Sequence, residues 1–391
     1  MLNGERKIAR PLRWAMIGGG RLSQVGYKHR TGALRDNTAF RLVAGAFDLD
    51  IERGKDFGRN LGVDEDRLYP DYRTLIAEEA KRHDGVEVVT VATPNFTHHE
   101  ITKACLKAGL HVICEKPLFF TVAECEEVAA LADEKGLIVG VTYGFTGHPL
   151  VHQMAAMVKK GMLGDIRIVD LQYTHGFSSG DDTGASEAQR WRTNPKTSGP
   201  TFVLGDIGTH LYYLSELVLP HMKIEKLLCD RQSFIKSRAP LEDNAYVLSR
   251  YDNGAVGRLW VSSVNAGSMA SQRYRFVGSR ASVEWTDTQP NELIYEVQGE
   301  PPRILHHGMP YLEEESLRYE RMGALHTEGL GDSWANIYLW IAQAIDARNR
   351  GDEAFLKDHH YPGIAAGTEG VRWLENCVRS ADAGSVWVDF K

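Results

Sequence analysis

The sequence predicts an α/β protein of two domains: a doubly wound parallel sheet, followed by an α+β domain built on a large, open, mostly antiparallel sheet. The first third of the chain alternates short, almost wholly apolar runs with helical patterns. After about residue 150, runs that alternate apolar and polar residues replace them. The 391 residues suffice for two domains of ordinary size. We therefore expect domains at residues 1–147 and 148–391.

The first domain contains five runs that are typical of strands buried on both faces, because they are apolar along most of their length. Helical patterns separate these runs. In the last helix, Thr121 and Glu124 form a capping box, and Gly136 follows the final turn. The strands are expected at residues 13–20, 40–48, 85–94, 109–117 and 136–144.

The second domain begins with a helical pattern and then a strand over residues 165–177 with one polar face. Asn253-Gly254 is a hairpin signal between two further strands. Residues 300–332 are rich in Gly, Pro, His and Glu and predict a loop, and residues 333–351 predict an amphipathic helix.

Composition excludes several function classes. There are 45 Lys and Arg residues against 52 Asp and Glu residues, so the net charge is −7, and no basic block is present. Nucleic acid and acidic membrane surfaces are therefore poor partners. The five cysteines are far apart and form no CxxC motif, which fits a reducing compartment. The N-terminus has no apolar core and no stretch reaches the length of a membrane span, so we expect a cytoplasmic protein.

Glycines follow the first strand in the pattern G-x-G-x-x-small. Gly18 allows a tight turn, Gly20 lets the backbone approach a pyrophosphate, and Ser23 permits close packing. A plain strand-to-helix turn is the alternative, but the position first in a βαβ pattern favours nucleotide binding. Asp48 ends the next strand, where an acid accepts hydrogen bonds from an adenosine ribose and repels a 2′-phosphate, so NAD is favoured over NADP. Its alternative role is a helix N-cap.

Polar residues also end the third and fourth strands. Thr93 and Asn95 could touch the nicotinamide ribose or the diphosphate, although both also suit a turn. Lys116 lies between Glu115 and Pro117, and Pro117 is a candidate for a cis peptide bond. An amine at this crevice could exchange a proton with a substrate hydroxyl. A surface lysine after a strand is the alternative.

Asp206 and His210 lie four residues apart ahead of a long apolar stretch. On a helix they would share one face, and the carboxylate could orient the imidazole. A satisfied core histidine is the alternative. We expect no metal site at the adjacent histidine pairs 98–99, 306–307 and 359–360, because neighbours on a helix do not face each other and no third ligand is suitably spaced.

Jointly, "MIGGGRLS", "TPNFTHHEI", "GLHVICEKPL" and "WRTNPKTSGPTFVLGDIGTH" resemble the Gfo/Idh/MocA family (glucose–fructose oxidoreductase and inositol dehydrogenase) over nearly the whole chain. The resemblance implies a Rossmann domain, then a domain whose open sheet builds homodimers or homotetramers. It also implies that Lys116 relays a proton, with Asp206 and His210 completing the catalytic group. The residues assigned to the cofactor are Gly18, Gly20, Ser23, Asp48, Thr93, Asn95, His98, Glu115 and Lys116.

The chain departs from the family pattern near the substrate. "SGPTFV" replaces the usual three glycines, and Tyr213 stands where an Asp is common. Arg190, Arg192 and Lys196 form a basic cluster that could clamp a carboxylate, phosphate or sulfonate, or could be a solvated loop. The substrate-binding candidates are Tyr143, His175, Trp191, Arg192 and Lys196.

These features predict an NAD-dependent oxidoreductase that acts on a hydroxyl of a sugar, sugar acid or cyclic polyol through a Lys/His acid–base relay. One alternative is an NAD-dependent glycosidase that oxidises, eliminates, hydrates and reduces an anionic glycoside. A second is a non-catalytic nucleotide-binding sensor. The expected partner is a small carbohydrate or polyol, either neutral or anionic.

Overall fold

Two units make up the chain. The structure is a computed structural model and describes residues 8–36, 38–181, 190–269 and 271–391. The parallel-sheet unit extends to Gly144 and includes Trp334–Val371, and the antiparallel-sheet unit comprises the described parts of Phe145–Ser333 and Arg372–Lys391. Residues 334–371 thus belong with the first sheet, whereas the boundary predicted at residue 147 placed them in the second domain.

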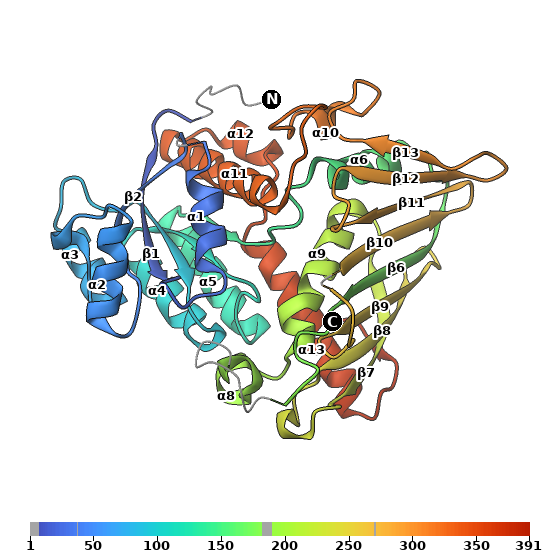
Figure 1. The fold of residues 1–391 in the computed structure, drawn as a ribbon, viewed down its shortest axis with the longest axis horizontal. Coiled ribbons are helices and arrows are strands. Elements are labelled where there is room, and N and C mark those ends of the chain that lie inside the picture. The colour runs from blue at the N-terminus through green and yellow to red at the C-terminus, as the bar shows by residue number, and fades with distance from the viewer. Residues whose placement is uncertain (1–7, 37, 182–189, 270) are drawn as a thin grey trace. The chain divides into compact units, whose positions relative to one another are not determined.

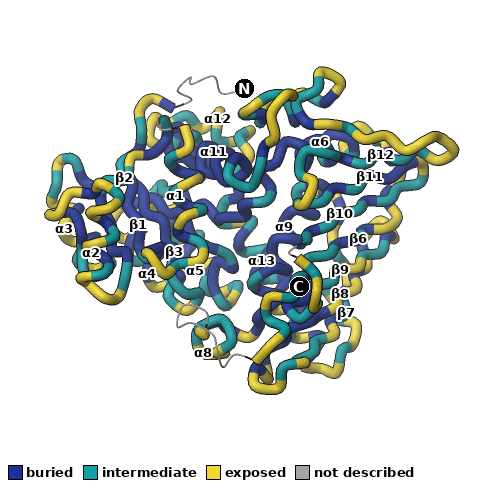
Figure 2. Tube along the Cα trace, in the orientation of Figure 1, coloured by how far each residue is buried: buried dark blue, intermediate teal, exposed yellow. Residues whose placement is uncertain are grey.

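The parallel-sheet unit contains a five-stranded sheet in the order β2-β1-β3-β4-β5, with every strand pair parallel. β3 is buried along its whole length, as expected for a sheet covered on both faces (Figure 2). The chain leaves β1 toward β2 on one side and returns to β3 on the other, so the carboxyl ends of β1 and β3 form a topological switch point. The strands are β1 (Leu12–Gly18), β2 (Phe40–Ala46), β3 (Val88–Ala92), β4 (His111–Cys114) and β5 (Val139–Val141).

Helices connect these strands (Figure 1). The predicted capping box of Thr121 and Glu124 is present, and Gly136 ends that helix in the left-handed conformation. On the first helix, the Nδ1 atom of His29 lies 2.8 Å from the hydroxyl of Tyr338, which fixes α1 against α11. The helices are α1 (Gly26–Leu34), α2 (Ile51–Asn60), η1 (Glu65–Arg67), α3 (Tyr72–Glu79), η2 (Asn95–Thr97), α4 (His98–Lys107), α5 (Val122–Lys135), α11 (Leu330–Arg350) and α12 (Glu353–Asp358).

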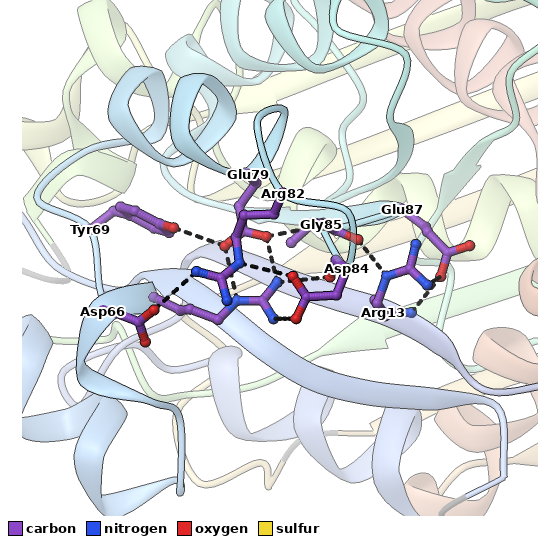
Figure 3. A network of polar contacts seen from close by, with 10 residues as sticks. Arg13, Asp66, Tyr69, Glu79, Arg82, Asp84, Gly85 and Glu87 are labelled. Atoms are coloured by element: carbon purple, nitrogen blue, oxygen red, sulfur yellow. Dashed lines mark hydrogen bonds and ion pairs between the residues drawn. The ribbon is translucent and has the colours of Figure 1, made fainter.

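A network of ion pairs holds the turn that leads into β3 (Figure 3). Buried Glu79 binds the guanidinium of buried Arg67, with 3.0 Å between Nε and Oε1. Glu79 also accepts hydrogen bonds from the Tyr69 hydroxyl at 2.8 Å and from the Val86 N–H at 3.1 Å. Removing either partner of such a buried pair typically costs about 3–5 kcal/mol, so the network fixes where β3 begins.

The antiparallel-sheet unit contains a nine-stranded sheet in the order β13-β12-β11-β10-β6-β9-β8-β7-β14, in which β6 and β9 are the parallel pair. The hairpin predicted at Asn253-Gly254 joins β8 and β9, and Gly254 has a φ of 84°. The strands are β6 (Ile166–Thr174), β7 (Ile224–Gln232), β8 (Asn244–Tyr251), β9 (Val256–Ser262), β10 (Ser271–Gly278), β11 (Ala281–Thr286), β12 (Glu292–Val297), β13 (Arg303–His306) and β14 (Val388–Asp389).

Helices cover one face of this sheet and form its core with it (Figure 1). Burial alternates along β8, so the opposite face is exposed. The predicted loop at 300–332 was wrong in part, because it contains β13 and α10. The helices of this unit are α6 (Pro149–Lys159), η4 (Trp191–Thr193), α8 (Pro195–Ser198), the π-helical turn η5 (Leu204–Gly208), α9 (Thr209–Val218), η6 (Lys236–Arg238), α10 (Glu314–Leu317) and the part of α13 (Ile364–Asp382) from Arg372 on. None of the helices in the described ranges has the length and apolarity needed to cross a membrane.

Candidate functional site

The turn after β1 can be made only by glycine. Gly18 has a φ of 76°, and a Cβ atom there would lie 2.6 Å from the carbonyl oxygen of Ala92 at the end of β3. A Cβ atom on Gly20 would lie 2.5 Å from the carbonyl oxygen of Phe47. The turn therefore runs directly over the switch point, where its backbone N–H groups are available to a pyrophosphate.

The close packing expected at Ser23 occurs instead at Gly26, where a Cβ atom would lie 2.0 Å from the carbonyl oxygen of Gly19. The Ser23 hydroxyl accepts hydrogen bonds from the N–H groups of Val25 at 3.3 Å and Gly26 at 3.0 Å. Ser23 thus supports the start of α1, and Gly26 takes the packing role. The sequence contained this signal, because Gly26 follows the motif by three residues.

Asp48 lies beside the glycine turn, since a Cβ atom on Gly20 would be 3.6 Å from its Oδ2 atom. Arg53 donates two hydrogen bonds to it, Nε to Oδ2 at 2.7 Å and Nη2 to Oδ1 at 2.6 Å. The hydrogen bond from Arg53 is the main cause that lowers the pKa of Asp48, so the carboxyl is ionised. The N-cap of α2 is Asp50, not Asp48, which leaves Asp48 available for a ribose.

The loop after β3 is tied to the loop after β4 by His98, which is fully buried. Its Nε2 atom lies 2.9 Å from the carbonyl oxygen of Thr93, and its Nδ1 atom lies 3.1 Å from that of Pro117. Burial lowers the pKa of His98. The expected direct cofactor contact by His98 does not fit this geometry, because the ring positions the two loops. Thr93 and Asn95 are partly exposed at the same edge.

β4 ends in a buried carboxylate followed by the candidate lysine. Glu115 is 6% exposed, accepts a hydrogen bond from the Thr142 hydroxyl, and lies 3.3 Å from Nε2 of His29. Burial alone would raise the pKa of Glu115, but His29, Lys116 and Thr142 outweigh it and bring the pKa to about 2. Glu115 therefore supports the loop from inside, and its expected contact with the cofactor stays a prediction. Lys116 is partly exposed, and the Lys116–Pro117 bond is cis, as predicted.

In the antiparallel-sheet unit, Asp206 lies in the π-helical turn η5, and His210 follows in the first turn of α9. The sequence prediction assumed a regular α-helix through both residues, so the π turn is a correction. π turns are rare and are frequent at functional sites. Gly208 permits it to pack, because a Cβ atom there would lie 3.0 Å from the ring of Trp373.

Asp206 and His210 have aromatic and acidic neighbours that the sequence analysis did not single out. Phe145 meets the His210 ring edge-on at 5.0 Å and the Tyr173 ring at 6.1 Å. Burial raises the pKa of Tyr173, and the charges of Asp287 and Asp206 raise it further. Burial also raises the pKa of Asp287 to about 6. Strand pairing brings Tyr173 and Asp287 together over a long sequence distance, so no local motif signals them.

His175 lies next to this group, with its ring 6.4 Å from that of Tyr173, and its role in substrate binding stays a prediction. Burial lowers its pKa, and the charge of Asp206 opposes that shift. The N–H of Phe177 donates to Nδ1 of His175 at 3.3 Å. The neutral ring therefore carries its proton on Nε2, which can donate to a substrate oxygen.

The three residues of the predicted basic cluster, Arg190, Arg192 and Lys196, have different surroundings. Arg192 lies over the ring of Trp191 at 4.6 Å, and its Nε atom is 4.0 Å from Oδ2 of Asp206. Arg190 and Lys196 are exposed. Arg192 and Trp191 therefore adjoin Asp206, whereas the exposure of Arg190 and Lys196 fits the solvated-loop alternative.

Tyr143 does not fit its predicted role in substrate binding. It is 1% exposed and belongs to the parallel-sheet unit, where a Cβ atom on Gly370 would lie 2.4 Å from its hydroxyl. Its ring fills the interior of that unit. For an aromatic residue that follows a buried strand, the sequence does not distinguish substrate binding from packing in the interior.

One group among the described residues has the composition of a metal site, namely His307, Glu320 and Glu328. Nδ1 of His307 lies 2.8 Å from Oε2 of Glu320, and this hydrogen bond raises the pKa of His307. Glu320 and Glu328 also accept backbone N–H groups, at 2.6 Å from Gly308 and 2.7 Å from Met322. The group thus organises the loop after β13.

Together the two units provide distinct chemistry. The parallel-sheet unit offers a glycine turn for a pyrophosphate, an ionised Asp48 for a ribose, and Lys116 for proton exchange. The antiparallel-sheet unit offers carboxylates, imidazoles and a phenol, which bind hydroxyl groups and exchange their protons.

Comparison with known proteins agrees with this chemistry. The family model GFO_IDH_MocA, described as an oxidoreductase family with an NAD-binding Rossmann fold, matches residues 12–143, and its C-terminal alpha/beta domain matches residues 155–390. The uncharacterized oxidoreductase YfiI of Bacillus subtilis (strain 168) is 67% identical over 392 residues and is covered completely, as is this chain.

Solved structures are similar over the same length. An inositol dehydrogenase homolog from Azotobacter vinelandii, complexed with NAD+, is 56% identical with a TM-score of 0.98, and the match covers 100% of both chains. The structure of that homolog with NADH and myo-inositol is 56% identical with a TM-score of 0.95, covering 99% of this chain and 100% of the other.

The family models match both the sheet with the glycine turn and the sheet with Asp206 and His210. The predicted fold class, the predicted enzyme class of oxidoreductase and the NAD cofactor are thereby confirmed. The chain belongs to the Gfo/Idh/MocA family of NAD-binding oxidoreductases.

Proposed function

We propose that the protein is an NAD-dependent dehydrogenase that oxidises a secondary alcohol of a neutral cyclic polyol or sugar, with inositols as the first candidates. The observation that carries the proposal is the group of polar side chains near Asp206, namely Tyr173, His175 and His210, which are able to bind hydroxyl groups. The complex of the 56% identical A. vinelandii homolog with NADH and myo-inositol supports the choice of substrate class.

Each candidate residue has a defined task in this reaction. Bound NAD+ would supply the hydride acceptor. The glycine turn holds its pyrophosphate, Asp48 binds its adenosine ribose, and Thr93 and Asn95 line the remainder of that edge. The one proton of the substrate hydroxyl goes to the Lys116/His210 pair, of which one member accepts it and returns it in the reverse direction, and Asp206 orients His210.

The charges favour a neutral substrate. The charges of Asp206 and Asp287 both raise the pKa of Tyr173, so the field at its hydroxyl is negative. The Nε atom of Arg192 lies 4.0 Å from Oδ2 of Asp206, so the carboxylate of Asp206 compensates part of the positive charge of Arg192. An anionic sugar would meet these carboxylates, whereas the hydroxyls of a neutral polyol can donate to them.

Substrate turnover with both products followed tests this proposal against the glycosidase alternative. We expect NADH to accumulate with an inositol or a neutral sugar in a panel that also holds anionic glycosides. Aglycone release should be absent, because oxidation of a free polyol leaves no leaving group. Release of an aglycone without net NADH would contradict the proposal, and cofactor binding with no turnover on any member of the panel would favour the sensor.

Asp48 is expected to set the cofactor preference. Replacing it (D48N) should weaken NADH binding and strengthen NADPH binding, changing their ratio by about tenfold or more, because like charges brought together in an interface cost several kcal/mol. Fluorescence titration with each nucleotide measures this ratio. D50N is the matched control, since Asp50 caps α2 in the same segment and should leave the ratio unchanged. An unchanged ratio in D48N would exclude the ribose role.

Lys116 is expected to act in turnover and not in cofactor binding. K116A should leave the Kd for NAD+ largely intact and lower kcat on the order of 10²–10⁴-fold, the effect of losing an acid–base group. K116R keeps the charge but exchanges no proton near neutral pH, so it should be as slow. K107A, at the exposed end of α4, is the control. Full turnover in K116A would rule out the assigned role.

A further inference from the structure

Glu242 anchors the segment that leads into the π turn. Its side chain is fully buried just before β8. Its Oε1 atom accepts hydrogen bonds from the N–H groups of Phe202 and Leu204, both at 2.9 Å. Its main-chain carbonyl accepts the N–H of Val203 at 3.4 Å. One residue next to the sheet therefore holds three consecutive residues at the start of the helical segment.

Arg231 on β7 completes this anchor. Its Nη1 atom lies 3.9 Å from Oε2 of Glu242 and donates to the carbonyl oxygen of Pro200 at 3.2 Å. Burial raises the pKa of Glu242 to about 7, against the opposing effects of the Leu204 N–H and Arg231. The thiol of Cys377 on α13 also interacts electrostatically with Glu242. A buried carboxyl group here costs stability, since Oε2 has no hydrogen-bond partner among the described residues and pairs with Arg231 only at 3.9 Å.

The anchor is connected to the functional residues by the backbone. The N–H of Asp206 donates to the carbonyl oxygen of Phe202 at 2.8 Å, so Asp206 is held by the residue whose own N–H Glu242 holds. Thr209, next to His210, donates its hydroxyl to the carbonyl oxygen of Gly205 at 2.9 Å. A shift of the first turn would therefore move both Asp206 and His210.

We propose that Glu242 is a positioning residue that fixes the first turn of the segment carrying Asp206 and His210 and so sets the orientation of both side chains. The proposal rests on the proposed function, because it assumes that these two residues act in turnover. Glu242 is buried and acts through the backbone, without a contact to substrate. Displacements of about 1 Å in a catalytic group are enough to cost on the order of 10²-fold in rate.

Kinetics of folded variants tests this role. E242A should lower kcat on the order of 10–100-fold and leave the Kd for NAD+ unchanged, because the cofactor residues lie in the other sheet unit. E242Q should recover most of kcat, since its amide oxygen can accept both N–H groups. Wild-type kcat in E242A, measured below its melting temperature, would overturn the proposal.

Combination with H210A separates positioning from general destabilisation. If Glu242 acts through His210, E242A should lower the residual kcat of H210A by less than about threefold. The same loss in both backgrounds would overturn the proposal. If E242A does not fold, E242D serves in the same cycle, because its shorter side chain keeps the charge but cannot reach both N–H groups.

Two controls complete the design. Asp243 is the neighbouring buried carboxylate, but its oxygens accept from Phe234 and Ile235 in another loop, each at 2.9 Å. D243N should lose stability and keep kcat, and an equal loss of kcat in D243N would overturn the proposal. The H210A variant by itself distinguishes a failure of the proposed function from a failure of the role of Glu242. Full turnover in H210A contradicts the proposed function, whereas slow H210A with fully active E242A contradicts only the role of Glu242.

Discussion

Parallel hydrogen bonding between β1, β3 and β4 is the constraint on which the cofactor edge depends. The register pairs Gly18 with Ala92 and Val91 with Cys114, so these strands end at nearly the same level. The glycine turn, Thr93 and the Glu115–Lys116 pair must then leave the sheet at one edge. A shift of one residue in β4 would exchange the faces of its side chains and turn Lys116 away. Strand register, rather than any single contact, thus makes the nucleotide site.

Buried carboxylates hold the loops that carry function in both units. Glu115 is ionised beneath Lys116, with its pKa brought to about 2, because His29, Lys116 and Thr142 outweigh its burial. Glu242 lies beneath the π turn with a pKa of about 7, because two N–H groups and a more distant Arg231 compensate it less fully. Neither contacts the solvent-facing chemistry directly. In each case a buried carboxyl group, which is costly to bury, fixes backbone next to a reactive side chain.

The sequence predicted what depends on local pattern. Apolar strands, the glycine turn and the acid after β2 follow from spacing, and the structure places Gly20 beside Asp48. The sequence could not predict the π turn at Asp206, because no residue preference marks such a turn. It also could not predict the interaction of Tyr173 with Asp287, because pairing between distant strands creates that interaction. The burial that removes Tyr143 from the surface likewise depends on packing. The roles of Lys116, Asp206 and His210 in turnover stay predictions.

The central claim is that a carbon-bound hydrogen of a neutral polyol leaves as hydride to NAD+. Deuterium transfer from the polyol that serves as substrate, labelled at its ring carbons, measures this directly by mass spectrometry of the nucleotide and the sugar product. Our account predicts one deuterium in each NADH formed and a ketone product that has lost it. Unlabelled nucleotide, with the deuterium returned to a hydrolysed sugar, would contradict it.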